Sequence, residues 1–226
     1  MLSLLALWLL SSTPCPHGEQ LEGGQHTRLA MKEGPIHLWC RGATVRGVVL
    51  YVHGYEDDVD SAFADHRLGA QFAKSGLEAL FIAVAAPTGP GQPVAFEDLD
   101  ALLEVVGVRL GGALRGPVLV VGHSGGHLTI RHWLRSPRVT EVVLLDGFYG
   151  DAAPWARWLA MRPSAKLRLI GRETWNKAEA WRLALAPRVK EQVKHERANC
   201  SHMDIVTKGD WLPRVIGELA IRGRPS

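Results

Sequence analysis

The sequence predicts an α/β protein whose central sheet is mostly parallel and is covered by helices on both faces. Continuous apolar runs rich in Val, Ile and Leu recur along the chain, and segments with the apolar spacing of helices separate them. No linker, internal repeat or low-complexity tract interrupts residues 27–222. We therefore expect a single domain over that range.

The predicted strands are short and lack polar alternation, which is typical of strands buried on both faces. A polar, Gly-rich lead-in at residues 18–25 precedes two strand-like stretches within residues 29–39. The run at 47–52 ends at a His-Gly dipeptide. Further strands are predicted at 79–84, 117–121, 142–145, 167–170 and 193–198.

Helices are predicted between these strands, where apolar residues recur every three or four positions. Residues 96–110 show the pattern well, with Leu99, Leu102, Leu103 and Val106 on one face. The other predicted helices are 61–74, 128–134, 153–160, 177–185 and 211–221.

Composition excludes several classes of protein. The 226 residues are 46% hydrophobic and 22% charged, as in ordinary globular proteins, so disorder, collagen and coiled-coil arrays are excluded. The net charge of +3 is small and is spread along the chain. It gives no reason to expect nucleic acid as a partner.

The N-terminus resembles a secretory signal. An apolar run at residues 2–10 is too short to span a bilayer, and small and helix-breaking residues follow it. We expect a signal peptide over residues 1–17 and export to the periplasm or the medium; without a signal, the protein would be cytoplasmic. Removal of Cys15 with the leader would leave Cys40 and Cys200, either as a disulfide or as two buried thiols.

The strongest chemical signal is the pentapeptide Gly-His-Ser-Gly-Gly at residues 122–126. It lies between a predicted strand and a predicted helix, where a sharp turn needs small flanking residues and leaves Ser124 exposed. The backbone N–H groups of the following helix would point at the reacting centre. Ser124 is therefore the candidate nucleophile.

A serine hydroxyl needs a base and a carboxylate that orients the base. We expect His202 as the base, because it follows the last strand; His195, inside that strand, is the alternative. For the acid, Asp146 directly follows the strand at 142–145, and Glu173 follows the next one. We favour Asp146 and keep Glu173 as the alternative.

The turn after the strand at 47–52 supplies the remaining part of such a site. An oxyanion hole needs two backbone N–H groups, and we expect them from Tyr55 and Gly125. His53 would brace this loop. An acidic run at residues 56–60 is expected to be a solvated loop with Asp60 or Ser61 capping the next helix, and a hard metal ion is the alternative.

Two tryptophans follow the candidate acid. Trp155 and Trp158 share one face of a short predicted helix and are expected either to line a substrate pocket or to seal the helix against the sheet. The histidines near Ser124 lack the spacing of a zinc site, so we expect no metal and no cofactor.

The order Ser124, Asp146, His202, the His-Gly turn and the alternation of strands and helices resemble the α/β-hydrolase superfamily over residues 27–222. The resemblance implies an eight-stranded sheet and hydrolysis of esters, lipids or amides. The commonest family pattern places the acid where Glu173 lies, whereas Asp146 is similar to the pancreatic-lipase type. The short connection at residues 151–164 implies a minimal, cutinase-like core without a cap.

We accordingly expect a serine hydrolase that cleaves carboxylic esters through an acyl-enzyme, with a small-molecule or lipid ester as substrate. An amidase or peptidase would use the same three residues. A non-catalytic binding protein on the same fold is the alternative from another class.

Overall fold

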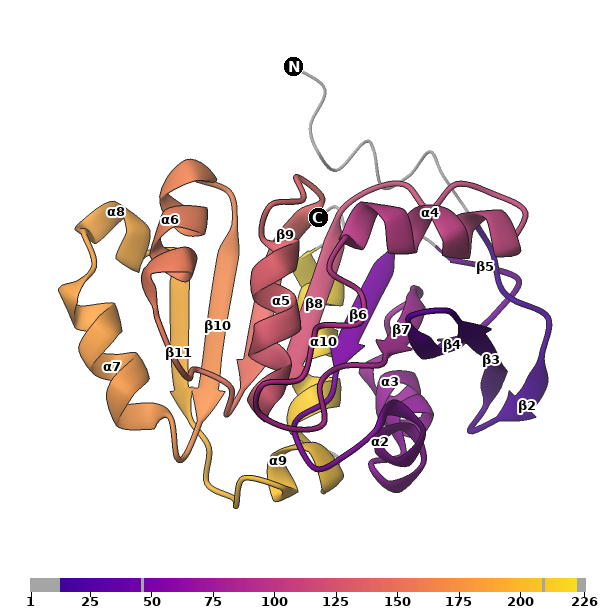
Figure 1. The fold of residues 1–226 in the computed structure, drawn as a ribbon, viewed down its shortest axis with the longest axis horizontal. Helices are drawn as coiled ribbons and strands as arrows, with labels where there is room; N and C mark the ends of the chain where they lie inside the picture. The colour runs from indigo at the N-terminus through magenta and orange to yellow at the C-terminus, as the bar shows by residue number, and fades with distance from the viewer. Residues whose placement is uncertain (1–12, 46, 209, 223–226) are drawn as a thin grey trace.

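The computed structural model describes residues 13–45, 47–208 and 210–222. Its main feature is a nine-stranded sheet in the order β11-β10-β9-β8-β6-β7-β4-β3-β2 (Figure 1). The strands of this sheet are β2 (Glu19–Leu21), β3 (Gly24–Met31), β4 (Gly34–Cys40), β6 (Val48–Val52), β7 (Leu80–Val84), β8 (Val118–His123), β9 (Val139–Leu145), β10 (Lys166–Gly171) and β11 (Val193–Arg197).

The sheet is parallel from β11 to β7 and antiparallel at the other edge. Strands β6 to β11 pair in parallel, and β4, β3 and β2 join them as antiparallel strands. All residues of β6, β7 and β8 are buried, which explains their continuous apolar sequence. The predicted mostly parallel sheet is confirmed.

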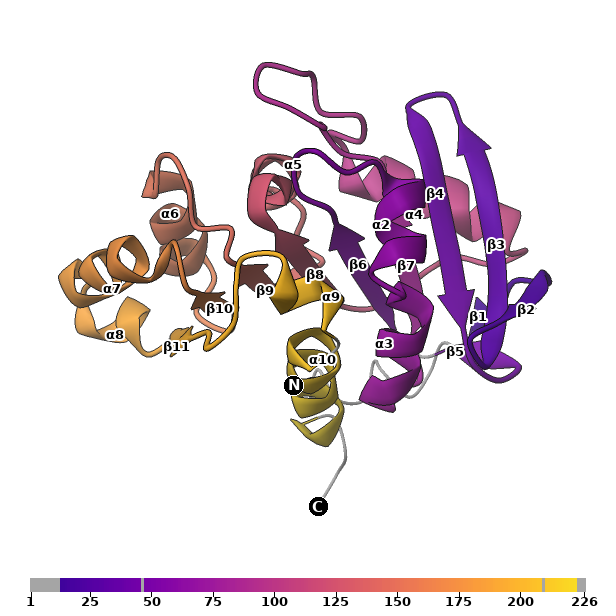
Figure 2. The same cartoon turned by 90° about the horizontal axis from the view of Figure 1, so that it is seen from below.

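Helices cover both faces of this sheet, as the alternating sequence pattern predicts. Figure 2 shows α4 and α5 on one side of the strands and α3 and α10 on the other. The helices are α2 (Val59–Asp65), α3 (Leu68–Ser75), α4 (Leu99–Arg109), α5 (His127–Trp133), α6 (Ala153–Met161), α7 (Trp175–Ala184), α8 (Pro187–Lys190), α9 (Asp204–Thr207) and α10 (Trp211–Arg222).

Two hydrophobic clusters fill the spaces between these layers. One contains apolar residues of α4, α5 and α6 and the alternate strand residues that face them, such as Leu50 and Val120. The other contains residues of α2, α3 and α10, with Val49 and Val121 from the opposite strand face. Successive strand residues therefore enter different clusters, as a pleated sheet buried on both sides requires.

The structure differs from the predicted elements in several places. The helix expected at 61–74 is broken into α2 and α3 by Arg67, whose φ is 50°. Asp58, rather than Asp60 or Ser61, caps α2 by accepting the Ser61 N–H at 2.8 Å. Strand β2 lies in the expected lead-in, and the sheet has nine strands rather than eight.

A second, two-stranded sheet joins β1 (Thr13–Pro14) to β5 (Thr44–Val45) and corrects the cysteine prediction. Its antiparallel pairing places the Cα atoms of Cys15 and Cys40 6.0 Å apart, and the two residues form a disulfide. Cys200 is a free thiol, so the pairing of Cys40 with Cys200 is wrong. Residues 1–12, with the apolar run of the expected signal peptide, lie outside the described residues.

The fold brings the candidate site residues to one edge of the sheet. Because the parallel strands all run in the same direction, their carboxyl ends lie together at the lower edge in Figure 1, where α9 is also found. The turns that follow β6, β8, β9 and β10 are thereby gathered at this edge. In the described part of the chain no helix has the length and hydropathy needed to cross a membrane.

Candidate active site

The turn after β8 holds Ser124 in a conformation that is uncommon for a residue with a side chain. Its φ is 47°, in the left-handed region, and the chain passes from strand to a short 3₁₀ turn, Ser124–Gly126, and then into α5. Strained backbone of this kind is concentrated at functional sites and is the expected geometry of a nucleophile elbow. The prediction of this strand–turn–helix unit is confirmed.

The turn after β6 lies directly against the Ser124 turn, and two glycines allow this close approach. A Cβ atom on Gly54 would lie 2.9 Å from the Ser124 Cβ, and one on Gly125 would lie 2.5 Å from the Tyr55 ring. His53 braces the turn, since its Nδ1 bonds the Gly54 carbonyl at 2.7 Å and its Nε2 accepts the Ala86 N–H at 3.0 Å. The two expected oxyanion donors, Tyr55 and Gly125, are therefore neighbours.

Asp146 directly follows β9 and is fully buried, with an exposure of 0%. Its Oδ1 accepts the N–H groups of Arg172 at 3.1 Å and Thr174 at 2.9 Å, together with the Thr174 hydroxyl at 2.9 Å. Its Oδ2 accepts the Glu173 N–H at 3.2 Å. Burial alone would raise the pKa of this carboxyl, but the bonds from His202, Thr174 and Glu173 hold the pKa well below its usual range.

His202 lies in the loop between β11 and α9 and faces the same carboxylate. Its Nδ1 is 3.0 Å from Asp146 Oδ2 and 3.7 Å from Glu173 Oε2. The hydrogen bond to Asp146 raises the pKa of His202, the two carboxylate charges add to this effect, and burial opposes it. Since Nδ1 binds the carboxylate, Nε2 is the ring nitrogen left to exchange a proton with a hydroxyl.

Several contacts bring Ser124 next to the Asp146–His202 pair. The backbone at Gly147 packs on Ser124, because a Cβ there would lie 3.1 Å from the Ser124 carbonyl oxygen. The His123 ring lies 4.7 Å from the His202 ring, centroid to centroid. Among the described residues the Ser124 hydroxyl makes no hydrogen bond within 3.5 Å, and catalytic hydrogen bonds are often long before substrate binds.

The model of the alpha/beta hydrolase family matches residues 49–218, about three quarters of the chain. The chain belongs to the alpha/beta hydrolase family. No curated protein matches it.

Solved structures of low sequence identity share the fold. A thermophilic, thermostable carboxylesterase cloned from a metagenomic library has a TM-score of 0.60 and 14% identity, with 98% of this chain and 94% of that chain covered. An esterase from Pyrobaculum calidifontis has a TM-score of 0.58 and 15% identity, covering 97% and 87%. A hormone-sensitive lipase from a metagenome library has a TM-score of 0.57 and 17% identity, covering 97% and 90%.

In this alpha/beta hydrolase the two candidate acids face the same histidine nitrogen from neighbouring strand ends. Asp146 is nearer and is buried, whereas Glu173 is 58% exposed in its side chain and accepts a hydrogen bond from the Tyr149 hydroxyl at 3.4 Å. The residue that sequence reasoning missed is Thr174, which gives Asp146 two hydrogen bonds. A threonine just after a strand end is too common a feature to have identified it.

The alternative base, His195, lies away from this group. Its Nδ1 is 2.8 Å from Glu179 Oε2, and its ring stacks on Trp175 with centroids 3.9 Å apart. These contacts place it on the α7 side of the sheet's β11 edge. Of the two histidines predicted as the base, His202 is therefore the one that lies beside the residues of this turn, with its ring 4.7 Å from that of His123.

The expectation that Trp155 and Trp158 line a substrate pocket is wrong. Their exposures are 0% and 3%, and both belong to the hydrophobic cluster that includes α4 and α5. A side chain with no accessible surface does not touch a solvent-filled pocket. The apolar face of α6 meets the sheet, so these rings seal the helix against the strands. This is the second of the two roles expected for them from the sequence.

The site's acid and base groups are also the one metal-ligand cluster found in the described ranges. Ligand atoms of Asp146, Glu173 and His202 lie within 4.8 Å of one another. The hydrogen bond between Asp146 and His202 accounts for two of these three groups without an ion.

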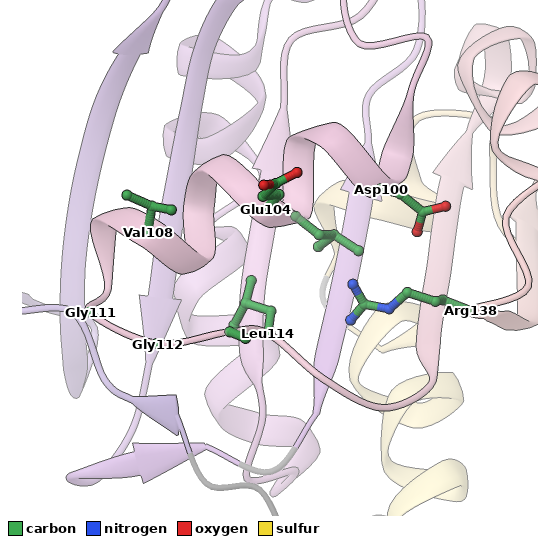
Figure 3. A pocket seen from close by; sticks show the side chains of 9 residues that line it. Asp100, Glu104, Val108, Gly111, Gly112, Leu114 and Arg138 are labelled. Atoms are coloured by element: carbon green, nitrogen blue, oxygen red, sulfur yellow. The ribbon is translucent and has the colours of Figure 1, made fainter.

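A separate recess lies at the opposite edge of the sheet. Its volume is about 530 Å³, and its lining includes Asp100, Glu104, Leu114 and Arg138 from α4 and from the segments that lead into β8 and β9 (Figure 3). The amino ends of the strands are at this edge, whereas Ser124 follows the carboxyl end of β8. This recess is therefore not part of the candidate active site.

Proposed function

We propose that the protein is a serine hydrolase that cleaves carboxylic esters, with Ser124 as nucleophile, His202 as base and Asp146 as the acid that orients it. The observation that carries the proposal is the 3.0 Å hydrogen bond between His202 Nδ1 and the buried Asp146, next to a serine in a left-handed turn. A buried carboxylate that fixes the histidine tautomer is what a base for a serine hydroxyl requires.

The reaction follows from these positions. The Ser124 Oγ attacks the ester carbonyl carbon while its proton passes to His202 Nε2, and Asp146 stabilises the imidazolium that forms. The negative charge on the carbonyl oxygen is bound by the N–H groups of Tyr55 and Gly125. His202 then gives the proton to the departing alkoxide, which leaves Ser124 acylated.

Hydrolysis of the acyl-enzyme repeats the sequence with water in place of Ser124. His202 takes a proton from the water, the hydroxide attacks the acyl carbon, and the same N–H groups bind the second oxyanion. The proton returns to Ser124 Oγ as the carboxylic acid leaves. Besides the ester and one water molecule, each step of the cycle uses a side chain or backbone group of this chain.

An ester substrate is favoured over an amide by the nature of the structural relatives. The three structures above are a carboxylesterase, an esterase and a lipase, and at identities of 14% to 17% they share the fold of this chain. The connection between β9 and β10 carries only α6, so a small-molecule or lipid ester would meet an open site.

Covalent labelling tests the proposal directly. A fluorophosphonate should label the wild-type protein at Ser124, and Ser124→Ala should lose both labelling and hydrolysis of p-nitrophenyl esters while its thermal unfolding is unchanged. Labelling of a different residue, or hydrolysis that survives in the Ser124→Ala variant, would contradict the mechanism. Comparing p-nitrophenyl esters with the matching anilides then separates an esterase from an amidase.

We also propose that the protein is exported. The disulfide between Cys15 and Cys40 supports this, because such bonds persist in oxidising compartments. A signal peptide would then have to end before Cys15, earlier than residue 17. N-terminal sequencing of protein recovered from the periplasm or medium of a bacterial host tests both points, and recovery of uncut protein from the cytoplasm alone would refute export.

A further inference from the structure

His123 contacts both members of the proposed Ser124–His202 pair. It directly precedes Ser124 at the end of β8, and its side chain is buried with an exposure of 1%. Its Nε2 lies 3.1 Å from the backbone carbonyl of His202, and the two rings are 4.7 Å apart between centroids. The end of β8 is thereby linked to a loop that is 79 residues further along the chain.

The hydrogen bond fixes the protonation of the His123 ring. A carbonyl oxygen only accepts, so Nε2 carries the proton and Nδ1 is left with its lone pair. Nδ1 is buried without a hydrogen-bond partner in the described part of the protein, and it faces the tight turn at Gly54, where a Cβ would lie 3.0 Å away. Burial and the neighbouring His202 lower the pKa of His123 to about 3.

An uncharged His123 ring suits this position better than an imidazolium would. When His202 takes the Ser124 proton, a positive charge forms on a ring 4.7 Å from His123, and a second imidazolium there would oppose it. Neutral His123 adds no such repulsion and still donates to the His202 carbonyl. The charge of the His202 imidazolium is then balanced by Asp146 and by the more distant Glu173.

The loop that carries His202 is also held by hydrogen bonds on either side of that residue, and the neighbouring Met203 carbonyl accepts the Val206 and Thr207 N–H groups, each at 3.1 Å. Residues 199–203 form neither a strand nor a helix, and the Ala198 N–H bonds the Gly171 carbonyl at 2.9 Å just before them. The Ile205 N–H bonds the Ser201 carbonyl at 3.3 Å as α9 begins. Between these two bonds, the His123 contact holds the backbone of His202 itself.

We propose that His123 is a positioning residue of the hydrolase. It holds the His202 backbone so that the imidazole stands between Asp146 and Ser124, and its uncharged ring packs beside the imidazolium during turnover. This inference rests on the proposed function. It adds a role for the second residue of the Gly-His-Ser-Gly-Gly segment that a nucleophile elbow does not itself require.

Two substitutions separate the hydrogen bond from the ring. His123→Gln keeps a neutral N–H donor, and His123→Phe keeps an aromatic ring without a donor; His195→Phe, at a buried histidine away from Ser124, is the matched control. We expect kcat of His123→Phe to fall about 30-fold with KM within about twofold, because small displacements of a base have large effects. His123→Gln should stay within about fivefold of wild type, since the donor is kept.

If the His123 side chain only filled space, the kcat values of the two variants would show a different pattern. Such a role would leave kcat of the folded His123→Phe protein near the wild-type value, and it would make His123→Gln the more damaging change; either result would overturn the proposal. Thermal unfolding of each variant gives the folded fraction for these rates. Equal loss in the His195→Phe control would also overturn it.

An NMR measurement on the wild-type protein and both variants keeps the test independent of activity. In a ¹⁵N-labelled sample, the His202 Nδ1 proton in the bond to Asp146 should appear far downfield and be lost or shifted in His123→Phe but kept in His123→Gln. The His123 ring should stay neutral down to about pH 5, and its titration above that pH would overturn the proposal. If fluorophosphonates fail to label Ser124 while these signals behave as expected, the proposed function fails and the placement of His202 by His123 stands.

Discussion

Replacing each of the two carboxylates that face His202 should have very different effects on turnover. Asp146→Asn removes a buried charge 3.0 Å from Nδ1. Two unit charges at this distance attract by about 5.5 kcal/mol at an effective dielectric constant of about 20, which corresponds to about 10⁴ in rate. Glu173 is 3.7 Å away but largely exposed, so solvent screening reduces its contribution to about 1 kcal/mol or less.

The hydrogen bonds of Asp146 explain why the Asp146→Asn variant should fold but lose its activity. Asparagine Oδ1 can accept the same bonds from Arg172 and Thr174, while its NH₂ group takes the place of the oxygen that faces His202 and loses only the bond from the Glu173 N–H. That NH₂ can only donate, so His202 Nδ1 must become an acceptor and Nε2 must carry the proton. The base is then unable to take the proton of Ser124.

The assay is kcat/KM for a p-nitrophenyl ester, measured for both variants beside wild type. We expect a loss of about 10³- to 10⁴-fold for Asp146→Asn and of less than about fivefold for Glu173→Gln. Far-UV circular dichroism and thermal unfolding establish that each variant is folded. A large loss in Glu173→Gln together with a small one in Asp146→Asn would refute the assignment and place the acid after β10.

Three further results are expected. Because its bond to Asp146 raises the pKa of His202, kcat/KM should increase with pH, with a midpoint above about pH 6.5. Glu173→Gln should shift this midpoint to lower pH, and an unchanged midpoint would exclude an effect of Glu173. Cys15→Ser removes the disulfide that closes a 25-residue loop and should lower the free energy of unfolding, measured in urea, by about 3.5 kcal/mol. Cys200→Ser should change this free energy by less than about 1 kcal/mol, and equal effects of the two substitutions would contradict the pairing. Trp155→Ala should destabilise the fold by about 3–5 kcal/mol and leave KM of the folded protein unchanged, and a large change in KM would restore its role in substrate binding.

The parallel part of the sheet could be predicted because burial on both faces leaves a plain signal in the sequence. The run at 48–52 is entirely apolar and entirely buried. The outer strand β2 has only three residues, two of them exposed, so its sequence resembles a loop. The break between α2 and α3 depends on the left-handed conformation of Arg67. A residue with a Cβ seldom adopts this conformation, and the local sequence gives no signal for it.

The positions of the candidate site residues could be predicted for a topological reason. Ser124 follows β8 and Asp146 follows β9, and the carboxyl ends of neighbouring parallel strands meet at one edge. This reasoning needs only the strand positions. It fails for side chains whose direction depends on packing: the face shared by Trp155 and Trp158 was identified, but whether that face met the sheet or a cavity was not. The cysteine pairing failed because it depends on the short ladder between β1 and β5.

A position at a strand end does not by itself decide which of the two candidate acids is buried beside His202. The buried carboxylate of Asp146 is stabilised by backbone N–H groups of residues 172–174, which form the turn after β10. Glu173 belongs to that same turn, so its N–H points at Asp146 while its side chain is directed to solvent and to Tyr149. The turn after β10 thus directs its backbone donors at Asp146 and leaves the Glu173 side chain 58% exposed. Of the two candidate acids, Asp146 is therefore the one that is buried where the donors converge.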